Sequence, residues 1–373
     1  MKRLLPIWLV VCTSAAWAGD AGTTSANFLK LGVGPRAEAM GEAQVAVADD
    51  VYATYWNPAG LAQLDSQEAG FVQSQYFQDI HEEYAAYAHP TERWGTFAGA
   101  ITYLGVGNFQ GFDAVGQPTG DVSAHDTAFS FSYAKPIWQD RRMGSQFSVG
   151  ANGKWIQESL AGVSASAYAI DAGVLFKPGH RWGEWAQGLR TGLTLRNVGT
   201  AMTFDNESFT LPRSLTAGVS YTGLLWNESV TVATDFQQPN DGARVLNAGI
   251  EVATLDIFLL RAGYTTFSDI GSGFRVGGGL RFKTLEVDYA FTNGGELGDA
   301  HRFGIVLHFG KPPPNPQADA QRLYERGVKE YHTGHYTDAM LDFNKALQID
   351  PGHPHAYDMM QKTYENLKAI NPQ

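Results

Sequence analysis

Hydrophobic and polar residues alternate along most of the chain. From Phe147 to Trp155 the odd-numbered positions are apolar or small, whereas the even-numbered positions are polar or glycine. Because successive side chains of a strand point to opposite faces, this pattern predicts a β-strand that lies between two different media. Similar units of about ten residues recur between residues 67 and 309, separated by turns rich in Gly, Asn, Asp and Pro. We count fourteen such units, of which the first three, around residues 68–77, 82–90 and 94–105, alternate less regularly.

The polar faces of these units carry many charged residues. The charges predicted to face the interior are Lys154, Asp171, Arg190, Arg196, Arg261, Arg275, Arg281 and Arg302. A soluble β-sandwich would also alternate, but so many apolar faces backed by arginines, acids and glycines would be unusual for one. An apolar outside and a charged inside predict a mainly β protein, a closed transmembrane antiparallel barrel. We expect the interior charges to pair and brace the barrel, and a binding site for an anionic headgroup is the alternative.

The connections between the units support this topology. In a barrel with both ends in the periplasm, every second connection is a tight turn and the others are longer external loops. Residues 254–256 and 283–284 fall among the tight turns. Residues 106–124, 199–212 and 294–300 fall among the longer connections.

The first eighteen residues have the pattern of a secretory signal. Lys2 and Arg3 precede an apolar run that ends at Cys12, and small residues surround the expected cleavage after Ala18. The apolar run is too short to span a bilayer as a helix. Cys12 is the one cysteine of the chain, so the mature protein is expected to be stable without disulfides. The net charge of -11 argues against a nucleic-acid partner. These features predict export to the cell outer membrane.

Residues 19–66 lack the alternation and are instead rich in small and turn-forming residues. The spacing of Gly32, Gly34 and Ala37 imitates a dinucleotide-binding fingerprint, but Pro35 interrupts it and no strand–helix pattern surrounds it. Residues 34–64, GPRAEAMGEAQVAVADDVYATYWNPAGLAQL, and residues 211–221, LPRSLTAGVSY, are more specific. Through them the chain resembles the PorV/PorQ family (UPF0164-like) of outer-membrane proteins, which is related to the FadL-type barrels.

The resemblance implies a FadL-like barrel of fourteen strands whose N-terminal segment folds back into the lumen as a hatch. The residues that would form this hatch or gate are Gly34, Arg36, Met40, Gly41, Trp56, Asn57, Pro58, Ala59 and Gly60. Glycine permits close backbone packing, and Asn followed by Pro favours a turn, so the assignment is physically reasonable. Whether the hatch opens as a gate or only fills the lumen stays open at this point.

After Gly310 the period of the pattern changes. A Pro-rich linker at residues 311–316 precedes a segment at residues 317–373 with helical periodicity. Small and aromatic residues there have the spacing of a tetratricopeptide repeat: Gly327, Tyr331, Ala339, Phe343, Ala346 and Pro351. A further helix containing Tyr357 and Tyr364 would cap the repeat. We expect this small all-α domain to lie in the periplasm.

The sequence contains no pattern that predicts catalysis. We find no catalytic motif, and we expect no cofactor and no metal, because His332, His335, His353 and His355 fall where such a repeat exposes its loops. Two non-enzymatic hypotheses remain. In the first, the barrel acts in type IX-like protein secretion or surface attachment, and the helical domain binds a periplasmic or secreted protein. In the second, it is a FadL-like channel for hydrophobic small molecules such as long-chain fatty acids. Outer-membrane lipid is a partner in both.

Overall fold

The computed structural model describes residues 22–113, 115–140, 144–226, 228–255, 257–267, 272–295, 298–310, 316–350, 353 and 355–370. The predicted signal, most of the predicted linker and Pro351 lie outside these residues.

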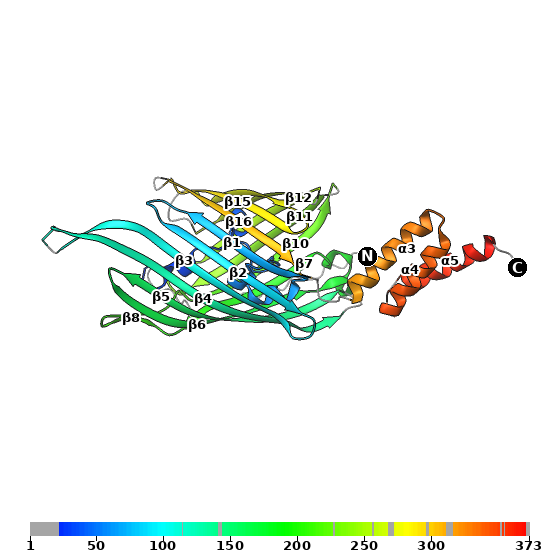
Figure 1. Ribbon diagram of the computed structural model, residues 1–373, viewed down its shortest axis with the longest axis horizontal. Coiled ribbons are helices and arrows are strands. Elements are labelled where there is room, and N and C mark those ends of the chain that lie inside the picture. Colours follow the sequence, from blue (N-terminus) through cyan, green and yellow to red (C-terminus); the bar gives the residue numbers. More distant parts are fainter. Residues whose placement is uncertain are drawn as a thin grey trace, which may run out of the picture.

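Fourteen antiparallel strands form a closed barrel, which confirms the predicted fold and strand number (Figure 1). Each strand pairs with its neighbours in chain order, and β1 closes the barrel by pairing with β16. The strands are β1 Gln67–Gln75, β2 His81–Thr91, β3 Gly95–Phe112, β4 Pro118–Asp140, β5 Ser145–Leu160, β6 Val163–Lys177, β7 Leu189–Gly199, β10 Ser214–Leu225, β11 Glu228–Pro239, β12 Val245–Thr254, β13 Phe258–Thr265, β14 Phe274–Arg281, β15 Leu285–Asn293 and β16 Asp299–Phe309. Closure leaves no unpaired strand edge in the lipid.

The alternation read from the sequence separates lipid from lumen. On β6, Tyr168 and Ile170 are 65% and 61% exposed on the outside, while Ala169 between them and Asp171 after them are buried inside. A charged side chain that faces the middle of the lipid costs about 2–4 kcal/mol when it is Arg or Lys, so this orientation is the stable one.

The barrel has two unlike ends. We call the end where β1 begins and β16 ends the base, and the opposite end the mouth. At the base the turn at 282–284 is tight, but the connection at 178–188 is longer and holds two short helices, η3 Gly179–Trp182 and η4 Glu184–Ala186. Tryptophan gathers at the base: Trp94, Trp138, Trp182 and Trp226 are all exposed there. An aromatic belt of this kind marks a membrane interface.

One of the predicted loops is not a loop. The long connection predicted at residues 106–124 is mostly strand, because β3 continues to Phe112, β4 begins at Pro118, and only a short turn joins them. Polar and glycine residues in this stretch hide the alternation, yet the two strands stay paired as far as Phe112 and Pro118 and form the longest extension of the mouth (Figure 1). The connection between β7 and β10 holds a hairpin of β8 Met202–Phe204 and β9 Glu207–Phe209.

Three helices follow the barrel: α3 Pro316–His332, α4 Tyr336–Ile349 and α5 Ala356–Ile370. Among the described residues, no helix is long and apolar enough to cross a membrane. Phe343 and Ala346 of α4 are fully buried, and a Cβ atom added to Gly327 of α3 would lie 2.7 Å from the Phe343 ring. Absence of a side chain at Gly327 therefore lets α3 approach α4 closely.

Candidate functional site: the lumenal hatch and the cavity at the base

Residues 22–66 run through the inside of the barrel, and we call this segment the hatch. It contains η1 Asn27–Lys30, α1 Pro35–Ala39, α2 Ala53–Trp56 and η2 Pro58–Gln63. The hatch starts at the mouth, where Thr24 forms a β-bridge with Thr210, and it ends at the base, where it continues into β1. Most of its side chains are buried between these two points.

Glycines of the barrel wall make room for the hatch. Nine strands each place a glycine against hatch atoms, and we call this set the glycine girdle: Gly70, Gly150, Gly173, Gly192, Gly218, Gly249, Gly263, Gly277 and Gly304. A Cβ at Gly192 would lie 2.5 Å from the Val45 carbonyl oxygen, and one at Gly304 would lie 2.7 Å from the Pro35 ring. The wall and the hatch are thus in backbone-level contact on many sides, at packing density typical of a protein interior.

Met40 and Gly41 contact the wall closely from the hatch side. Gly41 adopts a positive φ of 64°, and a Cβ there would lie 2.5 Å from the backbone nitrogen of Tyr264 in β13. Met40 is fully buried against Gly249 of β12. Only glycine at position 41 meets both the left-handed backbone and the lack of space.

The Asn-Pro-Ala motif forms the lower turn of the hatch. The Asn57 side chain accepts a hydrogen bond from the Ala59 N–H at 3.1 Å and donates to the carbonyl oxygens of Val45 at 2.8 Å and Val174 at 3.2 Å. Val45 belongs to the hatch and Val174 to β6. Asn57 therefore caps η2, ties the hatch to itself and ties it to the wall with one fully buried side chain.

Other predicted hatch residues also lie in the interior. Trp56 is buried and its indole N–H donates to the Val33 carbonyl oxygen at 2.8 Å. The guanidinium of Arg196 on β7 lies 5.0 Å from the Tyr55 ring centroid and 5.5 Å from that of Trp56. These cation–π contacts attach α2 to the wall. Gly34 adopts a φ of 93° before α1, and Gly60 packs on the Ala48 carbonyl.

A buried acid anchors α1 to three consecutive strands. Glu38 is 2% exposed, and its carboxylate pairs with Arg275 of β14 and Arg302 of β16. The Thr292 hydroxyl of β15 donates to the same carboxylate at 2.8 Å. Two guanidinium groups thus share one buried charge of the hatch, and Arg275 also lies 3.2 Å from Glu42.

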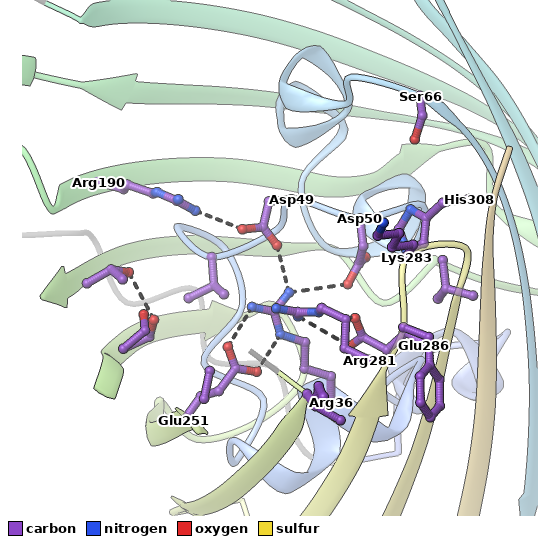
Figure 2. A pocket seen from close by; sticks show the side chains of 18 residues that line it. Arg36, Asp49, Asp50, Ser66, Arg190, Glu251, Arg281, Lys283, Glu286 and His308 are labelled. Carbon is purple, nitrogen blue, oxygen red and sulfur yellow. Dashed lines mark hydrogen bonds and ion pairs between the residues drawn. The ribbon is translucent and has the colours of Figure 1, made fainter. Parts of the chain in front are cut away.

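Arg36 holds the hatch on its other side (Figure 2). Its guanidinium donates to both carboxylate oxygens of Glu251 on β12, at 2.9 and 3.0 Å, and to Asp49 of the hatch at 2.6 Å. Asp49 also accepts from Arg190 of β7 at 3.0 Å, and Asp50 lies 3.5 Å from Arg36. This chain of charges links two strands that are not neighbours through the hatch, and its bidentate pair is the stronger kind of ionic hydrogen bond.

The remaining predicted lumenal charges pair within the wall. Lys154 lies 2.7 Å from Asp171, and Arg261 lies 2.7 Å from Glu251 and 3.2 Å from Glu286. Arg281 bonds to Glu286 at 2.6 Å. All eight charges predicted to face inward do so, and most of them take part in ion pairs.

A cavity of about 830 Å³ lies between the hatch and the base. Its lining is largely charged, with Arg36, Asp49, Asp50, Arg190, Glu251, Arg281, Lys283, Glu286 and His308 around it (Figure 2). Such a lining suits water, ions or a polar chain segment, and it would desolvate an apolar molecule poorly.

Sequence reasoning missed two parts of this site. The first is Glu38, whose role depends on arginines that are distant in sequence. The second is the glycine girdle, although its signal was present: glycine recurs on the inward face of strand after strand. Both become visible only when the wall closes around the hatch.

Comparison with known proteins then identifies the family. The family model described as type IX secretion system protein PorV matches residues 16–238. This chain belongs to the PorV family. The resemblance read from residues 34–64 and 211–221 is thereby confirmed. No curated protein matches the sequence of this PorV-family chain.

Solved structures similar to this PorV-family barrel include transport proteins. The Ralstonia pickettii toluene transporter TbuX has a TM-score of 0.51 at 14% identity, over 75% of this chain and 99% of that chain. The CymD monoaromatic hydrocarbon channel has a TM-score of 0.52 at 13% identity, over 74% of this chain and 98% of that chain. A Pseudomonas aeruginosa FadL homologue has a TM-score of 0.42 at 11% identity, over 74% and 96%. At their identities the likeness to TbuX and CymD concerns the fold alone, which is that of an outer-membrane barrel.

Proposed function

We propose that this chain is a non-enzymatic outer-membrane protein of PorV type that acts in the secretion or surface attachment of exported proteins. The observation that carries this proposal is the fixed hatch. Glu38, Arg36 and Asn57 hold it to strands around the barrel, and the glycine girdle surrounds it. A barrel filled in this way suits a platform for protein partners better than an open pore.

The C-terminal helices would supply a docking module on the periplasmic side. Their mutual packing uses Gly327, Phe343 and Ala346, which leaves other large side chains outside. Tyr357 and Tyr364 of α5 are 55% and 58% exposed. Exposed aromatic side chains on a helix are typical anchors for a protein partner.

Deletion of residues 317–373 should abolish co-purification of an exported protein partner and leave the barrel folded. The reason is that α3–α5 form their own apolar cluster, with Ala320, Ala346 and Ala356 at its centre. The measurement is affinity purification from the native outer membrane with quantitative mass spectrometry, beside heat-modifiable gel migration as a test of barrel folding. The double variant Tyr357→Ala/Tyr364→Ala should reduce the amount of this partner that co-purifies. Lys362→Ala, at another exposed position of α5, is the matched control and should leave that amount unchanged. An unchanged set of partners would contradict the docking role.

A FadL-like channel for hydrophobic small molecules is the second candidate. An apolar cluster near the mouth favours it, formed by Phe28, Leu29, Ile156, Met202, Leu211 and several alanines. On this hypothesis Asn57→Ala should change the uptake of a labelled long-chain fatty acid at least several-fold, because it loosens the lower hatch. Uptake into cells that express either form is the measurement. Equal uptake with wild type, Asn57→Ala and no barrel would exclude this candidate and leave the first untouched.

A further inference from the structure

A second large cavity lies at the mouth, far from the charged one at the base. Its volume is about 620 Å³. It lies between the inward faces of the extended strands β4 to β6 and the β8–β9 hairpin, at the end of the barrel where β8 is drawn in Figure 1. The cavity is of the size that takes one small organic molecule.

The cavity wall is mainly apolar and is left open. Leu160 and Val163, which flank the β5–β6 turn, are 54% and 53% exposed, and Phe209 of the hairpin is 37% exposed. Ala124 and Phe204 complete the apolar lining. Apolar side chains that face inward and stay this exposed gain free energy when a ligand covers them.

Two carboxylates are the charged groups of the same wall. Asp126 of β4 and Glu158 of β5 are directly opposite each other in the strand register and face the cavity side by side. Each accepts one backbone hydrogen bond, Asp126 from Ser159 and Glu158 from Ala26. In the described part of the chain, neither carboxylate forms an ion pair with a basic side chain.

This pair differs from those acids deeper in the lumen that have basic partners. Asp171 pairs with Lys154, Glu251 pairs with Arg36 and Arg261, and Glu38 pairs with two arginines. Like charges directly opposite each other on neighbouring strands are destabilising. Asp126 and Glu158 therefore leave a local excess of negative charge at the edge of an apolar cavity, which a cation would neutralise.

We propose that the mouth cavity binds a small amphiphilic cation, with an apolar body on Leu160, Val163 and the hairpin phenylalanines and a protonated amine between Asp126 and Glu158. The charge of the carboxylates selects against fatty acids and other anions of the same size. The proposal rests on neither function proposed above, because it uses only the lining of this cavity and its two carboxylates.

A matched series of ligands tests the site: 4-phenylbutylamine, 4-phenylbutanol and 4-phenylbutyrate, which share one apolar body. Binding to the full chain in lipid nanodiscs is measured by calorimetry, with empty nanodiscs subtracted. The amine should bind roughly tenfold more tightly than the alcohol, and the carboxylate more weakly than the alcohol. In Asp126→Asn/Glu158→Gln the amine should bind like the alcohol, whose affinity should stay unchanged.

Two further variants separate charge from shape. Asp121→Asn removes an exposed acid from the same strand and should leave all three affinities unchanged. Val163→Trp fills the cavity and should weaken the amine and the alcohol together. Equal binding of amine and alcohol to the wild type would overturn the proposal. So would an amine preference that survives the double variant, or binding of calcium ions alone without the amine.

Discussion

Glu38→Gln should loosen the hatch more than any other single change of a polar side chain. The substitution removes the one negative charge that Arg275 and Arg302 share. Arg302 then loses its ion pair with Glu38, and Arg275 keeps only its longer contact with Glu42 at 3.2 Å. Breaking a buried ion pair by removing one partner costs about 3–5 kcal/mol, and here two arginines lose the same partner. We therefore expect a lower thermal unfolding midpoint and, in planar bilayers, ion conductance that the wild type lacks.

The release of the hatch can be followed directly. The only cysteine of the chain, Cys12, lies in the predicted signal, so Ala43→Cys would place a single thiol in the mature hatch. Ala43 is fully buried, and its cysteine should react slowly with a maleimide in the wild-type background and rapidly with Glu38→Gln. Glu92→Gln, in an exposed turn at the base, is the matched control. Equal labelling rates in all three backgrounds would show that Glu38 does not hold the hatch.

Gly263→Val should displace the hatch by direct overlap. Gly263 on β13 faces Met40 and Gly41, and a Cβ atom there would overlap the hatch backbone, which cannot move away like a flexible side chain. Overpacking of a dense interior costs about 1–3 kcal/mol or more, and a clash with backbone belongs at the upper end. We expect reduced resistance to heat and denaturant, together with rapid labelling of the thiol at position 43.

Gly153→Val supplies the control for this prediction. Gly153 lies in β5 on the outward face, and a Cβ atom there meets nothing within 4 Å. The same substitution in a strand glycine should thus leave the hatch in place, and added valine suits a lipid-facing strand. If both valine variants lose stability equally, the loss comes from strand geometry and not from the contact between wall and hatch.

These two predictions bear on both candidate functions. If the chain is a secretion or attachment platform that docks partners on α3–α5, the loosened variants should still bind those partners, because the helices pack on one another and not on the hatch. A channel requires the hatch to yield, and the loosened variants should then raise uptake. Under both hypotheses the charged cavity lies on the side of the hatch that faces the base.

The barrel could be predicted from local sequence because each strand carries its own two faces. Period-2 alternation separates lipid from lumen within a single unit such as Phe147–Trp155, and no distant residue is needed to recognise it. The extension formed by β3 and β4 could not be predicted in this way, because its residues do not alternate. Beyond the membrane neither face needs to be apolar, so the strands there carry no alternation, and only their mutual pairing stabilises them.

What the sequence alone determined is the barrel, its strand number, its charged interior and the segment that enters it. Which charges meet was decided by closure of the barrel, because Glu38 reaches Arg275 and Arg302 across more than two hundred positions of the chain. Closure likewise gathers the glycine girdle around the hatch, whereas Asp126 and Glu158 meet through the register of the β4–β5 pair. Contacts between residues distant in sequence depend on register and curvature, which are properties of the closed wall and not of any one strand.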